Sequence, residues 1–167
     1  MSRGLFSGII LFVMIEKTVA KILLKKKLTV AVAESCTGGL IAHTLTNIPG
    51  SSGYFVCGFV AYADQAKVHL LGIPPALLKE HGAVSQQTAI AMAQNIKHLT
   101  QASIGVGITG IAGPGGGLPL KPVGTVFIAV AYGHHTYFKK FAFRGNRLKI
   151  KERASDAALT LLYQCLN

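Results

Sequence analysis

The hydrophobic positions of the chain fall into short continuous runs and into helically spaced stripes. Continuous apolar runs rich in β-branched residues are typical of strands buried in a sheet. Gly133-His134, between the last two runs, predicts a tight hairpin turn. The runs predict strands over 28–33, 54–62, 102–108, 124–132 and 135–143.

Apolar residues at helical spacing occupy most of the sequence between these runs. Ser85 precedes one stripe as a helix N-cap would, and Gly72 follows another as a C-terminal glycine would. Pro49-Gly50 ends a third stripe of this kind. The stripes predict helices over 12–24, 36–48, 64–71, 75–81, 86–99 and 150–165.

The order of these elements is that of one α/β domain. It predicts a three-layer α/β/α sandwich around a mixed, mostly parallel sheet that includes an antiparallel hairpin. Ligands of such sheets bind beyond the carboxyl ends of the strands. Ser35, Tyr62 and Thr109 lie at the ends of three predicted strands. We therefore expect them at one edge of the sheet.

The N-terminus has two interpretations. Arg3 precedes an apolar run over 5–15 that resembles a signal peptide but is too short to span a bilayer. The helical spacing from Phe12 to Leu24 favours a packed first helix over export. We divide the chain into an N-terminal extension at 1–10, which could be flexible, and one domain at 11–167.

Composition limits the partners and the compartment. Seventeen Lys and Arg against six Asp and Glu give a net charge of +11, which attracts phosphates, nucleic acid or anionic lipid at long range. Basic and aromatic residues mix at 137–144, but an ordinary edge strand explains this segment equally well. We expect neither a nucleic-acid nor a membrane partner. Three cysteines without a CxxC pair favour a reducing compartment and a cytoplasmic location.

The loop Ala33-Glu34-Ser35-Cys36-Thr37-Gly38-Gly39 carries the strongest chemical signal. A serine between a strand and a helix is placed to act as a nucleophile, because free N–H groups of the first helical turn can stabilise an oxyanion. Thr37, Gly38 and Gly39 would supply these groups. Two alternatives stay open from the residues alone: Ser35 could be only a helix N-cap, and Cys36 could be the nucleophile.

A nucleophilic serine needs a base. The six histidines all fall on predicted helix surfaces or turns, so a Ser-His-Asp triad has little support. A buried lysine that works as a neutral amine is the alternative, and Lys67, one short helix after Tyr62, is the candidate. Taken alone, Lys67 is equally an ordinary solvated helix residue.

The glycine-rich loop 109–117 offers backbone amides after a strand, as an anion site needs, although a flexible connector has the same composition. The run 105–110 fits GxGxxG, but its first glycine lies inside a strand and no helix follows, so dinucleotide binding is discarded. The chain has no HExxH motif and no cluster of carboxylates, so we expect no metal and no cofactor. Candidate phosphate ligands are Lys121, Arg144 and Arg147.

Several ordered motifs together resemble the CinA C-terminal domain family, from about Ile15 to the C-terminus. Besides the Ser35 loop, they are Tyr62 with Ala66-Lys67, 81–85, 109–114, 121–124 and Gly145-Asn146-Arg147. The resemblance implies a bacterial nicotinamide mononucleotide amidohydrolase, which releases nicotinate mononucleotide and ammonia in pyridine nucleotide salvage. It also implies the three-layer sandwich, without the molybdopterin-binding-like domain of longer relatives.

Residue by residue, the resemblance makes Ser35 the nucleophile and Lys67 its general base, with Tyr62 and Thr109 in the same polar cluster. The implied substrate-binding residues are Cys36, Thr37, Gly38, Gly39, Gly110, Gly113 and Arg147. The partners are then a nucleotide substrate and, by default, identical chains in a homo-oligomer.

Two departures from the usual family pattern surround the proposed dyad. Residues 62–67 read Tyr-Ala-Asp-Gln-Ala-Lys where relatives usually have Tyr-Ser-Asn-Glu-Ala-Lys, and Lys151 stands where an arginine is common. A related enzyme with a different carboxamide substrate therefore stays open. The net charge of +11 and the competence-related name of the family leave open another function, a non-enzymatic basic module that binds nucleic acid or an anionic surface.

Overall fold

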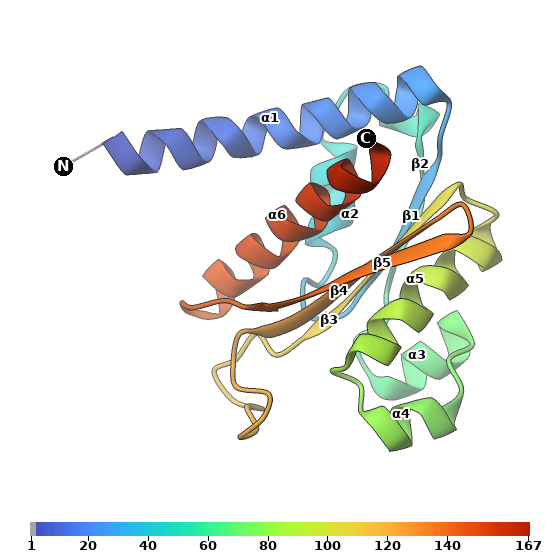
Figure 1. Ribbon diagram of the computed structural model, residues 1–167, viewed down its shortest axis with the longest axis vertical. Coiled ribbons are helices and arrows are strands. Elements are labelled where there is room, and N and C mark those ends of the chain that lie inside the picture. The colour runs from blue at the N-terminus through green and yellow to red at the C-terminus, as the bar shows by residue number, and fades with distance from the viewer. Residues whose placement is uncertain (1–2) are drawn as a thin grey trace.

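A computed structural model describes the backbone of residues 3–167 and the side chains of residues 15–167. Its centre is a five-stranded sheet in the order β2-β1-β3-β4-β5 (Figure 1). Strands β1, β2 and β3 pair in parallel, whereas β4 pairs antiparallel with both β3 and β5, so β4 runs against the other four. The strands are β1 Val30–Glu34, β2 Phe55–Val60, β3 Ile104–Gly110, β4 Thr125–Tyr132 and β5 His135–Ala142.

Helices cover both faces of the sheet. In Figure 1, α1, α2 and α6 lie on one side, and α3, α4 and α5 lie on the other. The arrangement is a mixed α/β sandwich of three layers, as the order of elements predicts. The helices are α1 Arg3–Lys26, α2 Leu40–Thr46, α3 Asp64–Leu71, α4 Pro75–His81, α5 Gln86–Thr100 and α6 Arg147–Leu166, with a 3₁₀ turn at Ser51–Gly53.

The central strands form the core because their apolar runs are buried on both faces. Every residue of β1 is buried, as its unbroken apolar run predicts. Helix α6 buries Ile150, Ala154 and Leu161 against one face of the sheet. Helix α5 lies on the other face and begins at the predicted cap, where Ser85 Oγ accepts a hydrogen bond from Thr88 N at 3.1 Å.

Glycines let α5 approach β3 closely. A Cβ on Gly105 would lie 2.0 Å from the Ala93 carbonyl oxygen, and one on Gly107 would lie 2.4 Å from the Ala89 carbonyl oxygen. Neither distance leaves room for a side chain. The GxGxxG pattern thus belongs to helix–sheet packing, which agrees with discarding it as a dinucleotide signal.

Two helix starts differ most from the predictions. Helix α1 begins at Arg3, well before Phe12, and α2 begins only at Leu40, four residues after the predicted start at Cys36. The predicted extension at 1–10 stays a prediction, because residues 1–2 and the side chains of 3–14 lie outside the described part. Among the described residues, no helix is both long and apolar enough to cross a membrane.

Candidate active site

Ser35 lies directly beyond β1, between the ends of its two neighbouring strands. Glu34, the last residue of β1, is aligned with Val60 of β2 and with Ile108 of β3. The backbone continues this pairing, because Ser35 N donates to the Ile108 carbonyl at 3.1 Å. Ser35 therefore lies at the carboxyl edge of the parallel strands, where ligands of such sheets bind.

The carboxylate of Glu34, rather than Ser35, caps helix α2. It is buried and accepts three backbone hydrogen bonds, from Gly39 at 3.0 Å, Ile41 at 3.2 Å and Ala42 at 2.8 Å. These are the N–H groups that the start of a helix leaves without intrahelical partners. The helix-cap alternative for Ser35 is thus wrong. No hydrogen bond of its hydroxyl appears among the described interactions, so this hydroxyl has no structural role of that kind.

Hydrogen bonds within the turn occupy two of the three N–H groups that were expected to stabilise the oxyanion. Gly39 N–H is taken by Glu34, and Gly38 N–H donates to the Ser35 carbonyl at 3.1 Å. Of the three expected donors, only the Thr37 amide has no acceptor within the described part of the chain. The Thr37 hydroxyl is also buried without a partner there. Gly38 and Gly39 shape the turn instead, with φ values of 63° and 94° that favour glycine.

Cys36 is unsuited to be the nucleophile. Its side chain is only 5% exposed and packs in the core on the α6 side of the sheet. Burial raises the pKa of its thiol to about 12, so at neutral pH the reactive thiolate is scarce. The thiol lies in the core, so we expect only the backbone of Cys36 to be able to contact a substrate.

Lys67 is buried on α3, contrary to the solvated alternative. It is 1% exposed, and its Nζ donates to the Tyr62 carbonyl at 3.0 Å and to Asp64 Oδ1 at 3.3 Å. Ala61, which precedes Tyr62, donates its N–H to the Glu34 carbonyl at 2.8 Å. The segment that leads into α3 therefore runs beside the Ser35 turn. The described interactions include no hydrogen bond between Lys67 Nζ and Ser35 Oγ.

Arg147 joins two parts of the predicted site. Its guanidinium donates to the Tyr62 hydroxyl at 2.6 Å and to the Gly113 carbonyl at 2.8 Å. It thereby connects the residue beyond β2 to the glycine-rich loop.

Thr109, by contrast, is buried near the end of β3 and donates its hydroxyl to the Ala83 carbonyl at 2.7 Å. Gly110 has no room for a side chain, since a Cβ would lie 2.7 Å from the Thr125 carbonyl oxygen.

Lys151 is a site residue that the sequence reasoning noted only as a departure. Its Nζ lies 3.4 Å from the position that a Cβ on Gly38 would take. It follows Arg147 by one helical turn on α6, so both cations face the Ser35 loop. The four-residue spacing from Arg147, near the start of a predicted helix, could have indicated Lys151 from the sequence. Of the other candidate phosphate ligands, Lys121 donates to the His81 carbonyl at 3.2 Å, and no side-chain contact of Arg144 is described.

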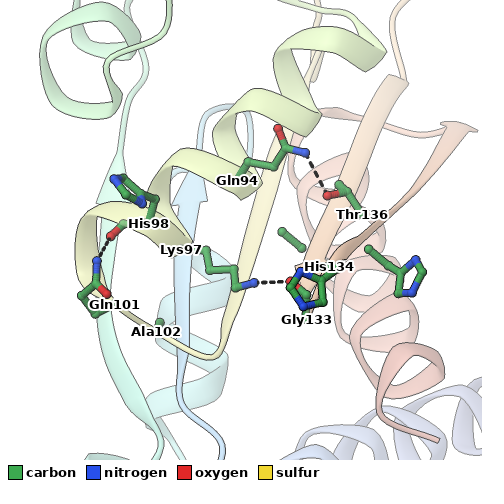
Figure 2. A pocket seen from close by; sticks show the side chains of 10 residues that line it. Gln94, Lys97, His98, Gln101, Ala102, Gly133, His134 and Thr136 are labelled. Atoms are coloured by element: carbon green, nitrogen blue, oxygen red, sulfur yellow. Dashed lines mark hydrogen bonds between the residues drawn. The ribbon is translucent and has the colours of Figure 1, made fainter.

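A hollow lies at the opposite edge of the sheet, between the end of α5 and the β4–β5 turn (Figure 2). Lys97 Nζ donates there to the Gly133 carbonyl at 2.6 Å, and Gln94 to the Thr136 hydroxyl at 3.0 Å. Several of its polar groups therefore bond to one another. In the nearby segment 137–144, Phe141 stacks on Phe143 at 5.3 Å, and both pack against the core. These contacts favour the edge-strand interpretation of that segment.

Comparison with known proteins identifies similar chains. The family model of the CinA C-terminal domain matches residues 13–166. A relative from Caldicellulosiruptor bescii, named as competence-damage inducible, is 52% identical over 149 residues, which are 89% of this chain and 36% of that protein. A CinA-like protein of Syntrophus aciditrophicus is 50% identical over 91% of this chain and 36% of its own length. The chain thus spans about a third of these curated relatives.

Solved structures share the fold. The competence/damage inducible protein CihA from Agrobacterium tumefaciens superposes with a TM-score of 0.90 at 38% identity, over 93% of this chain and 95% of that one. A CinA superfamily protein from Klebsiella pneumoniae superposes with a TM-score of 0.88 at 30% identity, over 92% and 96% of the two chains.

Proposed function

Because the chain belongs to the CinA C-terminal domain family, we propose that it is an amidohydrolase that converts nicotinamide mononucleotide to nicotinate mononucleotide and ammonia. The observation that carries the proposal is that a serine whose hydroxyl makes no described hydrogen bond and a buried lysine lie at the same edge of the sheet. We further propose a cytoplasmic role in pyridine nucleotide salvage, in an assembly of identical chains.

In this mechanism Ser35 Oγ attacks the carboxamide carbon, and its proton passes to Lys67, the proposed general base. The resulting oxyanion accepts a hydrogen bond from the Thr37 amide. The C–N bond then breaks, Lys67 returns the proton to the leaving nitrogen, and ammonia departs. Water attacks the acyl ester and gives a proton to Lys67. When the ester bond breaks, Lys67 returns this proton to Ser35 Oγ, which restores the hydroxyl and releases nicotinate mononucleotide.

The cations at the α6 end suit the phosphate of the nucleotide. Arg147 is already oriented by Tyr62 and Gly113, and Lys151 lies one turn further along the helix. A guanidinium with a fixed orientation loses little freedom on binding a phosphate. We propose that these two residues bind the phosphate and that Tyr62 positions Arg147.

The test is ammonia release from nicotinamide mononucleotide by the purified chain. Ser35→Ala and Lys67→Met should each lower kcat at least about 1,000-fold, because each removes a group needed in the transition state. Ser52→Ala and Lys79→Met are the matched controls, since both residues are exposed. Arg147→Ala should instead act mainly through KM. Undiminished turnover by Ser35→Ala would refute the mechanism.

The same assay separates the alternatives. Turnover of another carboxamide in preference to the nucleotide would indicate a different substrate for the same chemistry. A strongly salt-dependent affinity for DNA, without any amidase activity, would favour the basic binding module instead.

A further inference from the structure

A pocket of about 300 Å³ lies between α1, α2 and α6, apart from the Ser35 loop. Its walls include Glu16 of α1, Leu40 and His43 of α2, and Ser155 and Asp156 of α6. The volume is about ten times the share of one water molecule in the liquid, so the pocket has room for a small organic group.

The pocket concentrates negative charge in a chain that carries +11 overall. Glu16, Glu152 and Asp156 all line it, and they are three of the six carboxylates in the sequence. Glu152 pairs with Lys149 at 2.8 Å. No ion pair of Glu16 or Asp156 is found among the side chains that the structure describes. Two carboxylates therefore line this space without a salt bridge to any described side chain.

A buried hydroxyl gives an independent indication of a ligand. Ser155 is only 1% exposed, and its Oγ has no hydrogen-bond partner among the described residues. Ser155 lines the same pocket as the two carboxylates. A buried polar atom without a partner costs free energy, which a bound hydrogen-bond donor would recover.

Burial and neighbouring carboxylates destabilise the charged form of Asp156. Burial, together with the charges of Glu152 and Glu16, raises the pKa of Asp156 to about 6, against the opposing effect of Lys149. Burial likewise raises the pKa of Glu16, against the opposing effects of Lys17 and His43. A cation in the pocket would relieve this repulsion at neutral pH.

The chemistry of the walls selects among cations. Among the described side chains, no group of three or more His, Cys, Asp and Glu is arranged to hold a metal ion. Leu40 contributes an apolar surface, which favours a cation with an alkyl chain. A primary ammonium has three donors, which suits two carboxylates and one hydroxyl.

We propose that this pocket binds a small aliphatic primary amine, with the ammonium between Glu16, Ser155 and Asp156 and the alkyl chain against Leu40. This proposal is independent of the amidase function.

The probe is n-butylammonium, titrated at pH ~7.5 into the ¹⁵N-labelled chain while amide chemical shifts are recorded. We expect saturable shifts in α1, α2 and α6 with a dissociation constant of about 1 mM or below. n-Butanol and potassium chloride are the matched probes, which lack the ammonium and the alkyl chain respectively, and neither should give these shifts.

Asp156→Asn keeps the side-chain shape and should weaken butylammonium at least about tenfold, because a charge-assisted bond is lost. Ser155→Ala should weaken it about threefold to tenfold and serves as the second variant if Asp156→Asn alters the fold. Glu80→Gln, which removes an exposed carboxylate on α4, is the charge-matched control and should have no effect. Shifts that never saturate, that butanol reproduces, or that persist undiminished in both pocket variants would overturn the proposal.

Discussion

Substitution of Gly107 by alanine tests the close packing of α5 on β3. The added Cβ would lie 2.4 Å from the Ala89 carbonyl oxygen and 2.5 Å from Ala93 N. Ordinary contact begins near 3.4 Å, so α5 would have to move by about 1 Å. Both atoms belong to the helix backbone and cannot rotate away as the end of a side chain can.

The expected cost follows from this displacement. Overpacking of a tight interior costs about 1–3 kcal/mol, and the rigid helix backbone places Gly107→Ala near the upper end. The loss of glycine flexibility in the unfolded chain returns about 0.5–1 kcal/mol. The net destabilisation is about 2 kcal/mol. With a urea m value of about 2 kcal/mol per molar, the unfolding midpoint should fall by about 1 M.

The assay is urea unfolding followed by far-ultraviolet circular dichroism, since the chain has no tryptophan to report by fluorescence. Gly115→Ala is the matched control, because a Cβ there would meet nothing within 4 Å, and its effect should stay within about 0.5 kcal/mol. If Gly107→Ala unfolds at the same urea concentration as Gly115→Ala, the packing argument is wrong.

Three further substitutions test other contacts, each by the free energy of unfolding. Glu34→Ala should destabilise by about 2–4 kcal/mol, because three backbone N–H groups lose a charged acceptor. Thr37→Val should be neutral or stabilise by about 1 kcal/mol, since it removes a buried hydroxyl without a partner; a clear loss would reveal a hidden bond. For Asp156, the folded pKa of about 6 exceeds the unfolded value near 3.8. Its ionisation should therefore cost the wild type about 1–2 kcal/mol between pH ~4 and pH ~7.5, discounted for half burial, and Asp156→Asn should lack this fall.

The elements of this fold could be predicted from the sequence because their signals are local. Ser85 lies directly before α5, and Gly72 lies directly after α3. The apolar run of β1 is buried, as its composition predicts. The start of α2 could not be placed in this way. Its cap comes from Glu34, a carboxylate at the end of the buried β1, whereas capping rules look to the residue next to the helix.

The sequence motifs predicted those residues of the candidate site that lie at the ends of strands. Ser35, Tyr62 and Thr109 lie at neighbouring strand ends because parallel strands share a carboxyl edge. The burial of Lys67 was not evident from its sequence neighbours, and its assignment came from the family resemblance. The amine pocket could not have been found, since Glu16 and Asp156 lie near opposite ends of the chain and meet only through packing.

The division of roles between Glu34 and Ser35 has a practical consequence. Since the glutamate holds the turn and the helix together, the serine can be replaced without weakening either. Ser35→Ala should therefore melt at the same temperature as the wild type while it still admits the substrate. An inactive chain with an intact fold would be the natural material for crystallising the complex with an uncleaved nucleotide.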